Sequence, residues 1–278
     1  MASREYIVGL TKEADFQFLS DALEAAQDND VLRLQPGVHE SAAPIRKNVV
    51  LITASAQKDR EANAEEEEDI VQATLIAPSI EANVVLRNLK VEGRVDIMKG
   101  VVVIDECCIH EGADGIRVGA ECRLSLKNSR VSHCSVGGIG VYFMKGSTGE
   151  VENTDVYECR VYGILVDGAE VALRSNRIRD SACGICFRRH ASGLIEQNSV
   201  EYIQNFGICV TENSSPVVHS NRVQHCGVQC AYVSKESGGV FTENIFEGSI
   251  HVLANCRTRF IENRITGQAD IDTSLFAS

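Results

Sequence analysis

The sequence is poor in the residues and runs that mark several protein classes. It has no tryptophan, only 4 prolines and 5% aromatic residues in 278 positions. No run of about 18 apolar residues occurs, which argues against a membrane-spanning helix. The amino-terminal residues also lack the apolar core of a secretory signal peptide. We therefore expect an intracellular, cytoplasmic protein that does not insert into a membrane.

Clustered positive charge is scarce as well. The chain has 27 Lys and Arg against 39 Asp and Glu, a formal net charge of -12. Proteins that bind nucleic acid usually gather Lys and Arg on one face, so no nucleic-acid partner is expected. The 11 cysteines of a chain expected inside the cell predict reduced thiols rather than disulfides.

What the sequence has in abundance is one repeated unit. In residues 197–210, a polar pair containing Asn198 precedes the β-branched Val200 and is followed by Gly-Ile-x-Val. The same order recurs about every 22 residues between Asn88 and Ile265. Self-similarity at such a period indicates a solenoid, in which each unit forms one turn and stacked turns share a core.

Three sets of apolar residues are predicted to point inward, because alternate residues of a strand share a face. The first set is Leu86, Ile104, Leu126, Val151, Leu173, Ile195, Val218, Phe241 and Phe260. The second is Val91, Ile109, Val131, Val156, Ile178, Val200, Val223, Phe246 and Ile265. The third is Ile116, Ile139, Ile164, Ile185, Ile208 and Ala231, with Val118, Val141, Val166, Phe187, Val210 and Val233 beside it.

An asparagine lies near the bend of most units. Its side chain tolerates left-handed backbone angles, and its amide can hydrogen-bond the same group of the next turn. We interpret these residues as a structural ladder rather than as a functional site; they include Asn128, Asn153, Asn176, Asn198 and Asn221.

The segment before the repeats has helical spacing. Within residues 11–27, Phe16, Leu19, Leu23 and Ala26 fall on one stripe, and a strand is predicted at 31–34. Because the first turn of a solenoid needs a cover, residues 1–40 are predicted to form an N-terminal cap and residues 41–278 the solenoid. Residues 55–69 end in five consecutive acids and are predicted to form a solvated acidic loop.

Residues 21–26 followed by residues 30–40 resemble the opening of right-handed parallel β-helix proteins of the pectate-lyase-like superfamily. The later repeats resemble those named for carbohydrate-binding proteins and sugar hydrolases (CASH repeats), which also occur in intracellular F-box proteins and an SH2-domain-binding adaptor. The resemblance implies an all-β, single-stranded, right-handed parallel β-helix with an N-terminal capping α-helix, and the repeats predict about 8–10 turns. Such a fold hosts many functions and names none.

The outward face of the Gly-Ile-x-Val strands is the face that polysaccharide-acting enzymes of the superfamily use. Its central column is predicted to be Arg117, Gly140, Leu165, Cys186, Cys209 and Tyr232. Acid–base chemistry or calcium binding on a uronate chain needs several carboxylates, and this face offers few. We therefore predict no catalytic residue, no metal site and no cofactor.

One polar cluster is the exception. Tyr142, Asp167 and Arg188 are predicted on consecutive turns, with Arg189 and His190 following. If the protein is an enzyme, Asp167 would act as the base and Arg188 would hold an anion, with His190 nearby. The simpler interpretation is a surface ion pair, which contributes about 0–1 kcal/mol.

Several cysteines and histidines have suggestive spacing. Cys134 and Cys159 occupy the same position in adjacent turns, within disulfide reach, and are interpreted as free core thiols. Cys183 and Cys186 form a Cys-x-x-Cys pattern, but an extended strand would separate them by about 10 Å, which argues against a redox pair. The histidines beside Cys134 and Cys226 are not expected to bind zinc.

An exposed strip on the outward face is the predicted binding surface, composed of Arg117, Tyr142, Tyr162, Leu165, Asp167, Arg188, Phe206 and Tyr232. Exposed apolar patches mark interaction surfaces, and Tyr and Arg are enriched in binding hot spots. Our main hypothesis is a non-catalytic intracellular scaffold that presents this strip to a protein partner. The alternative is a carbohydrate-active protein: a polysaccharide lyase, hydrolase or epimerase, or a sugar-binding module. A second alternative is a self-assembling subunit, paired through an open C-terminal turn.

Overall fold

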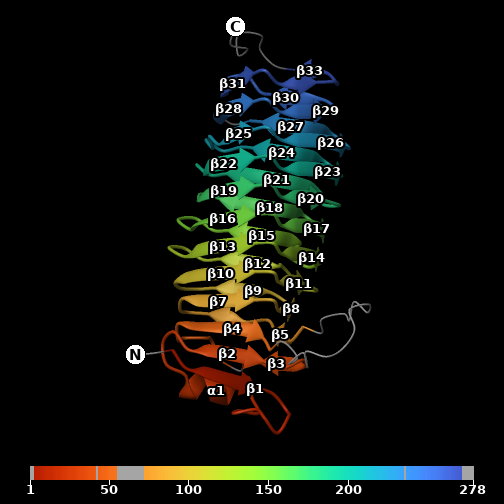
Figure 1. Cartoon of the computed structure of the whole chain (residues 1–278). Coiled ribbons are helices and arrows are strands. Elements are labelled where there is room, and N and C mark those ends of the chain that lie inside the picture. Colours follow the sequence, from red (N-terminus) through yellow and green to blue (C-terminus); the bar gives the residue numbers. More distant parts are fainter. Residues whose placement is uncertain (1–2, 42, 55–71, 235, 271–278) are drawn as a thin grey trace.

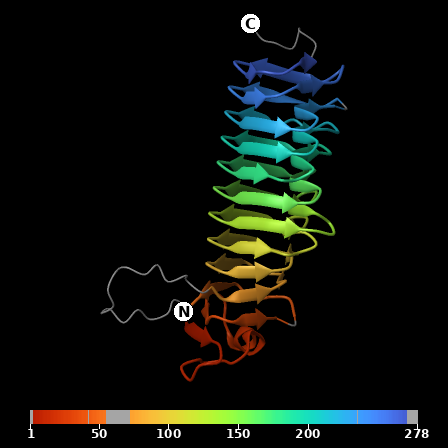
Figure 2. The same ribbon diagram turned by 90° about the vertical axis from the view of Figure 1, so that its right-hand side faces the viewer.

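The computed structural model describes residues 3–41, 43–54, 72–234 and 236–270. Its strands stack into a straight column, with the single described helix at the N-terminal end and the last described strand, β33 (Ala269–Asp270), at the other end (Figure 1). The view turned by 90° in Figure 2 shows the same stack of turns. The strands pair in parallel, and a typical turn gives one strand to each of three sheets, so the predicted all-β parallel β-helix is confirmed.

In the described residues the three sheets, here named A, B and C, contain 12, 11 and 10 strands, which makes about eleven turns, more than the predicted 8–10. Sheet A consists of β1 (Glu5–Val8), β2 (Val31–Leu34), β4 (Val49–Thr53), β7 (Val84–Arg87), β10 (Val101–Asp105), β13 (Arg123–Lys127), β16 (Thr148–Glu152), β19 (Glu170–Arg174), β22 (Ser192–Glu196), β25 (Val217–His219), β28 (Gly238–Thr242) and β31 (Arg257–Ile261). Sheet B consists of β3 (Val38–Glu40), β5 (Thr74–Ile76), β8 (Lys90–Glu92), β11 (Cys108–His110), β14 (Arg130–Cys134), β17 (Asp155–Cys159), β20 (Arg177–Arg179), β23 (Ser199–Ile203), β26 (Arg222–Cys226), β29 (Ile245–Glu247) and β32 (Arg264–Ile265). Sheet C consists of β6 (Ser79–Ile80), β9 (Val95–Ile97), β12 (Ile116–Val118), β15 (Ile139–Phe143), β18 (Tyr162–Asp167), β21 (Cys183–Arg188), β24 (Phe206–Val210), β27 (Gln229–Val233), β30 (Ile250–Val252) and β33 (Ala269–Asp270).

The core runs along the axis of the column. The predicted inward sets of sheets A and B are confirmed: Leu86 pairs in register with Ile104, and the series continues to Phe260. Val91 likewise begins the series of sheet B. Members of both series are buried, except for the partly exposed Ile265 of the last turn.

Sheet C departs from the prediction in one strand. Ile139 pairs with Tyr162, whereas Val141 pairs with Ile164 and Phe143 with Val166. The inward residues of β15 are therefore Val141 and Phe143, and the placement of Ile139 in the core was wrong. The turn before β15 is two residues longer than the turn before β18, and two residues preserve the alternation of faces while shifting the register. The Gly-Ile repeat at Gly138 hid this insertion; the structural equivalent of Gly163 is Gly140.

Glycine is required where the chain passes from sheet B into sheet C. A Cβ atom on Gly163 would lie 2.5 Å from Cγ2 of Ile178 and 2.8 Å from the carbonyl oxygen of Gly184. The same crowding recurs at Gly184, whose Cβ would lie 2.6 Å from Cγ1 of Val200. Gly184 and Ile185 thus both face the interior, so the strict alternation of faces is broken at this position.

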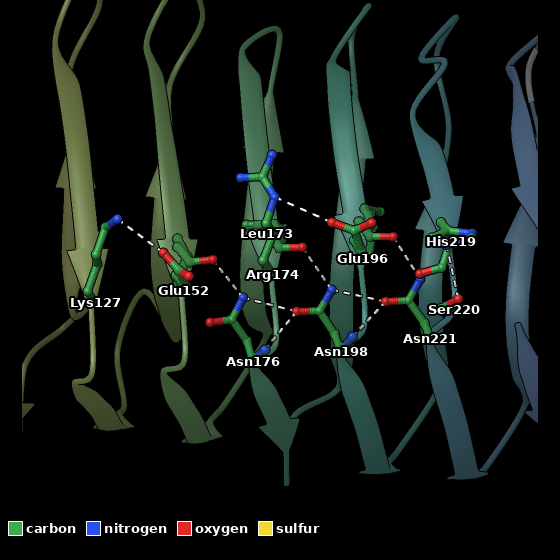
Figure 3. A network of polar contacts seen from close by, with 12 residues as sticks. Lys127, Glu152, Leu173, Arg174, Asn176, Glu196, Asn198, His219, Ser220 and Asn221 are labelled. Carbon is green, nitrogen blue, oxygen red and sulfur yellow. Dashed lines mark hydrogen bonds and ion pairs between the residues drawn. The ribbon is translucent and has the colours of Figure 1, made fainter.

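The asparagine ladder exists, and it occupies two neighbouring positions of the repeat. In the C-terminal half it is buried: Nδ2 of Asn176 donates to Oδ1 of Asn198 at 3.0 Å, and Asn198 donates likewise to Asn221 (Figure 3). Asn128 and Asn153 lie one position earlier, at the left-handed residue of the bend, with φ of 49° and 48°. The prediction gave one asparagine both roles, forming the bend and forming the ladder. In the structure, the bend and the buried ladder use two successive positions of the repeat.

The N-terminal end is closed by a short helix, α1 (Leu19–Ala25), whose Leu19 and Ala22 are buried. The helix is shorter than its apolar stripe predicts, because Phe16 instead forms a β-bridge with Val8. The strand β1 precedes the helix and pairs with β2, which the sequence did not indicate. The predicted acidic loop at 55–69 lies outside the described residues. No described helix is long and apolar enough to cross a membrane.

Candidate functional site

The outward face of sheet C combines charged and apolar residues. Cross-strand ion pairs such as Lys127–Glu152 and Arg174–Glu196, at 3.0 and 3.4 Å, line one outward column of sheet A (Figure 3). On sheet C, ion pairs occur toward the N-terminal end, and apolar residues follow. Its central column, in register from β12 to β27, is Arg117, Tyr142, Leu165, Cys186, Cys209 and Tyr232. The prediction was correct except that Tyr142 replaces Gly140, because of the shifted register in β15.

The apolar part of this column is covered by its own neighbours. Leu165 is 1% exposed and Cys186 3% exposed, although both point away from the core. They form a small cluster of their own with Cys183 and Cys209, against which Tyr162, Phe206 and Tyr232 pack. The expectation that Leu165 is exposed was therefore wrong. Burial also raises the pKa of Tyr162 above its ordinary value.

The aromatic rings of the strip stack along the axis. Phe206 and Tyr232 lie 4.8 Å apart at an interplanar angle of 22°, and Tyr232 lies 5.9 Å from His251 at 8°. Both faces of the Tyr232 ring are thus taken by rings of adjacent turns. A ligand on this part of the strip would meet ring edges rather than open ring faces.

Asp167, at the end of β18, collects the polar residues that the sequence singled out. Its Oδ2 accepts hydrogen bonds from Nη2 and Nε of Arg188 at 2.7 and 3.0 Å and from Nη1 of Arg189 at 3.0 Å. The hydroxyl of Tyr142 lies 3.4 Å from the same oxygen. The structure thus brings Tyr142, Asp167 and Arg188 together, as predicted. It adds Arg189, whose left-handed φ of 57° marks a sharp bend that sequence reasoning did not anticipate.

Asp167 lies beneath its partners rather than beside them. It is 2% exposed, and Oδ1 is buried without a hydrogen-bond partner among the described residues. Burial alone would lower the pKa of Arg188, but the hydrogen bond and charge of Asp167 outweigh it and raise that pKa. No hydrogen bond joins His190 to Asp167 in the described part of the chain. A substrate cannot reach Asp167 without displacing arginine, so this geometry does not make it a general base.

A second cluster of the same kind lies nearer the N-terminal end of the face. Asp114 is 6% exposed, with Arg94 at 3.9 Å and Arg117 at 3.7 Å. Asp96 lies 2.6 Å from Arg94 and 3.6 Å from Arg117. Sequence reasoning placed Arg117 and Asp114 on this face and missed Arg94 and Asp96. Extending the outward column one turn further, to Asp96 in β9, would have pointed to them.

Both clusters place guanidinium groups above a buried carboxylate on one face. Arg117 is in β12 and Arg188 is in β21, three strands further along sheet C. At a strand spacing of about 4.8 Å, the two clusters lie roughly 14 Å apart along the axis. Tyr142 and Tyr162 lie on the strands between them, β15 and β18.

Other polar groups offer less. Nδ1 of His133 lies 2.9 Å from Oγ of Ser132, and Nε2 lies 2.7 Å from Oε2 of Glu158. This is the hydrogen-bond order of a serine nucleophile, but Ser132 is 2% exposed and closed to a substrate. Among the residues that the structure describes, no group of three or more His, Cys, Asp or Glu could hold a metal ion. All 11 cysteines are free thiols.

Comparison with known proteins places these observations in a family. The model for "Right handed beta helix region" matches residues 79–186 and 114–266. The pectate lyase Pel9A structure is similar over 100% of this chain and 82% of that chain, with 11% identity and a TM-score of 0.58. An alginate lyase from Paenibacillus sp. is similar over 99% of both chains, with 10% identity and a TM-score of 0.51. A mannuronan C-5 epimerase module (AlgE4) from Azotobacter vinelandii is similar over 93% of both chains, with 12% identity and a TM-score of 0.53. No curated protein sequence matches. At such identities, the likeness shows the fold alone.

Proposed function

Because the chain belongs to the family of proteins with a right-handed β-helix region, we propose that it is a binding protein for an anionic polysaccharide. The ligand would lie along the outward face of sheet C, between β9 and β27. The names of three similar structures refer to pectate, alginate and mannuronan, which are chains of acidic sugars. These names suggest a ligand class, and the argument for binding comes from the face itself.

The observation that carries the proposal is the depth of the charged groups in the two clusters, with arginines at the surface and aspartates beneath them. Asp114 and Asp167 are 6% and 2% exposed, whereas the side chains of Arg117 and Arg189 are 36% and 62% exposed. A ligand therefore meets guanidinium donors first, with the carboxylates held beneath them. Guanidinium groups donate paired hydrogen bonds that fit a carboxylate. The buried aspartates also fix the arginine side chains in place, which lowers the entropy lost on binding.

The spacing of the clusters suits an extended polymer. Two donor groups roughly 14 Å apart can hold separate acidic groups of one chain lying along the axis. Tyr142 and Tyr162, on strands between them, add hydroxyl groups and partly exposed rings. Since the protein carries a net charge of -12, long-range attraction does not favour an anion, and binding would rest on these short-range contacts.

The same geometry favours binding over turnover. Lyases and glycosidases need accessible carboxylates or a metal, and Asp167 is enclosed by Arg188, Arg189 and Tyr142. We therefore expect no cleavage and no epimerisation of a bound chain. New ultraviolet absorbance after incubation with the polymer would indicate a lyase, and new reducing ends would indicate a hydrolase. Either signal, if it disappears in Asp167→Asn, would overturn this part of the proposal.

A protein partner remains the competing hypothesis for the same strip. The protein-partner hypothesis required an exposed apolar surface. However, Leu165, Cys186 and Cys209 are buried under neighbouring rings. The remaining exposed surface is mainly polar and aromatic. The polysaccharide therefore has the better geometric support, whereas the cytoplasmic location and the scaffold role remain predictions.

Affinity electrophoresis in gels containing polygalacturonate, alginate or neutral dextran tests the proposal. We expect retardation by the two acidic polymers and none by dextran. The double variant Arg117→Ala/Arg189→Ala should weaken binding at least tenfold, because a hydrogen bond to a charged group contributes about 1.5–3 kcal/mol. Each aspartate retains one arginine in this variant, so the fold should persist.

Arg222→Ala is the matched control. The Arg222 side chain is 54% exposed and lies 2.6 Å from Glu247, but it is on sheet B. Its loss should leave binding unchanged while altering the net charge in the same direction. Equal retardation of the wild type and the double variant, or no binding to either acidic polymer, would contradict the proposal.

A further inference from the structure

Three thiols gather on the outside of sheet C, beneath the aromatic residues of the strip. Because Gly184 and Ile185 both face inward, Cys183 and Cys186 point to the same outer side of β21. Both pack with Cys209 of the next turn in one cluster. The sequence-based argument against a redox pair assumed a regular extended strand, on which residues three apart point to opposite faces, and the structure departs from that assumption at Gly184.

Cys186 and Cys209 are also direct partners in the sheet. They face each other in register on the parallel strands β21 and β24. Adjacent strands lie about 4.8 Å apart, and disulfides join residues whose Cα atoms are about 4.4–6.8 Å apart. The Cα separation of these two residues therefore falls within the range of a disulfide.

A second pair of cysteines has the same register and a different environment. Cys134 and Cys159 are partners on β14 and β17, and their side chains lie in the central core, 1% and 0% exposed. Cys209 is 8% exposed, and partly buried rings of the strip, among them Phe206 and Tyr232, pack against its cluster. Small rotations of these rings would admit a reagent to the outer pair, whereas the inner pair is enclosed by the whole solenoid.

The environment also favours the reactive form of Cys209. Hydrogen bonds from the thiols of Cys183 and Cys186 lower the pKa of Cys209, and burial opposes this only in part. Thiolate is the form that attacks an oxidant. The thiols of Cys183 and Cys186 are shifted the other way, and their pKa values lie above the ordinary range.

We propose that Cys186 and Cys209 form a redox modification site, where hydrogen peroxide produces a reversible disulfide across β21 and β24. The Cys209 sulfur attacks peroxide, so that an S–O bond forms, the O–O bond breaks and hydroxide leaves, taking up the proton that Cys209 lost. The Cys186 sulfur then displaces the oxygen of the sulfenic acid, forming the S–S bond and releasing water. In total, two thiols lose two electrons and one peroxide becomes two waters. A dithiol reductant reverses the bridge by exchange.

The site lies under the proposed polysaccharide face but does not depend on it. The bridge would tie together two strands whose outward residues include Arg188 and Phe206. Its formation is a property of the thiols alone, so it can be measured without any ligand. Failure of polysaccharide binding would leave this inference untouched, and the reverse also holds.

The test is peroxide titration of the intact reduced protein, followed by alkylation of the remaining thiols under denaturing conditions and peptide mapping by mass spectrometry. We expect a Cys186–Cys209 disulfide to form at least tenfold faster than any modification of Cys134 and Cys159, and to disappear with dithiothreitol. Cys209→Ser should abolish it. Cys159→Ser, which removes one thiol of the inner pair, should leave it unchanged.

Two results would overturn the inference. One is complete alkylation of Cys186 and Cys209 after a peroxide dose that oxidises free glutathione. The other is a first disulfide between a different pair, for example Cys226 and Cys230, whose thiols interact inside the solenoid. Circular dichroism of each variant shows whether the solenoid has folded, and the wild-type map decides the question without any variant.

Discussion

Asn198 is a buried member of the asparagine ladder, so the loss of its side chain should destabilise the solenoid. Its Nδ2 donates to the carbonyl of Leu173 and to Oδ1 of Asn221, both at 3.0 Å. Its Oδ1 accepts from the backbone N–H of Asn176 at 2.9 Å and from the Asn176 amide at 3.0 Å (Figure 3). Asn198 is 1% exposed, so water does not replace these partners.

Asn198→Ala would remove all four contacts and leave buried groups on both neighbouring turns without their partner. A hydrogen bond contributes about 0.5–1.5 kcal/mol net, and a buried group left unpaired costs about 1–3 kcal/mol. We therefore expect the free energy of unfolding to fall by about 3–5 kcal/mol. Equilibrium unfolding in urea, followed by far-ultraviolet circular dichroism, measures this loss.

Asn153→Gly is the matched control for the ladder. Asn153 is exposed, has a left-handed φ of 48° that glycine adopts freely, and donates one hydrogen bond, to Asn128 at 2.8 Å. Its replacement should cost less than about 1 kcal/mol. If Asn198→Ala proves no more costly than Asn153→Gly, the buried ladder does not stabilise the solenoid as described.

Two further predictions concern packing and pH. Gly163→Ala should lower the urea midpoint, because the new methyl would lie 2.5 Å from Cγ2 of Ile178. The expected loss in the free energy of unfolding is about 1–3 kcal/mol. An unchanged midpoint would show that the chain between sheets B and C can move apart to accept the methyl. The hydrogen bonds from Lys127 and Ser125 hold the pKa of Glu150 below its ordinary value of 4.5. A depressed carboxyl pKa stabilises the fold above the unfolded-state value, and that contribution is lost as pH falls through the folded-state value. Between pH 7 and pH 3, the wild type should therefore lose slightly more stability than Glu150→Gln, and identical pH profiles would refute this ion pair as a stabilising contact.

The fold was predictable because every turn must place apolar side chains at the same positions of the core. The series beginning at Leu86 and at Val91 could be identified by spacing alone, since every turn needs an apolar residue at the same height of the core. The series of sheet C failed at Ile139, where an insertion of two residues kept the local motif and shifted the register. The strand β1 was missed because it comes before the helix and outside the repeat.

The candidate site was less predictable, because it depends on side-chain reach and on burial rather than on spacing. Tyr142, Asp167 and Arg188 were correctly brought together, but Arg189 joins them through a left-handed bend that no motif announces. Leu165 was expected to be exposed, since it points outward, and neighbouring rings cover it. The second cluster at Asp114 joins residues of separate turns and the bends between them, which a single column of the repeat does not include.

Hydrogen–deuterium exchange of the protein with and without polygalacturonate tests the central claim most directly. Backbone amides report protection strand by strand, so the position of the ligand on the three-sided column can be read without mutation. Our account predicts added protection in the loops and strands of sheet C from β12 to β24, centred on the segments that carry Arg117, Arg188 and Arg189. Protection confined to sheet A or sheet B, or none at a polymer concentration that retards the protein in gels, would contradict it.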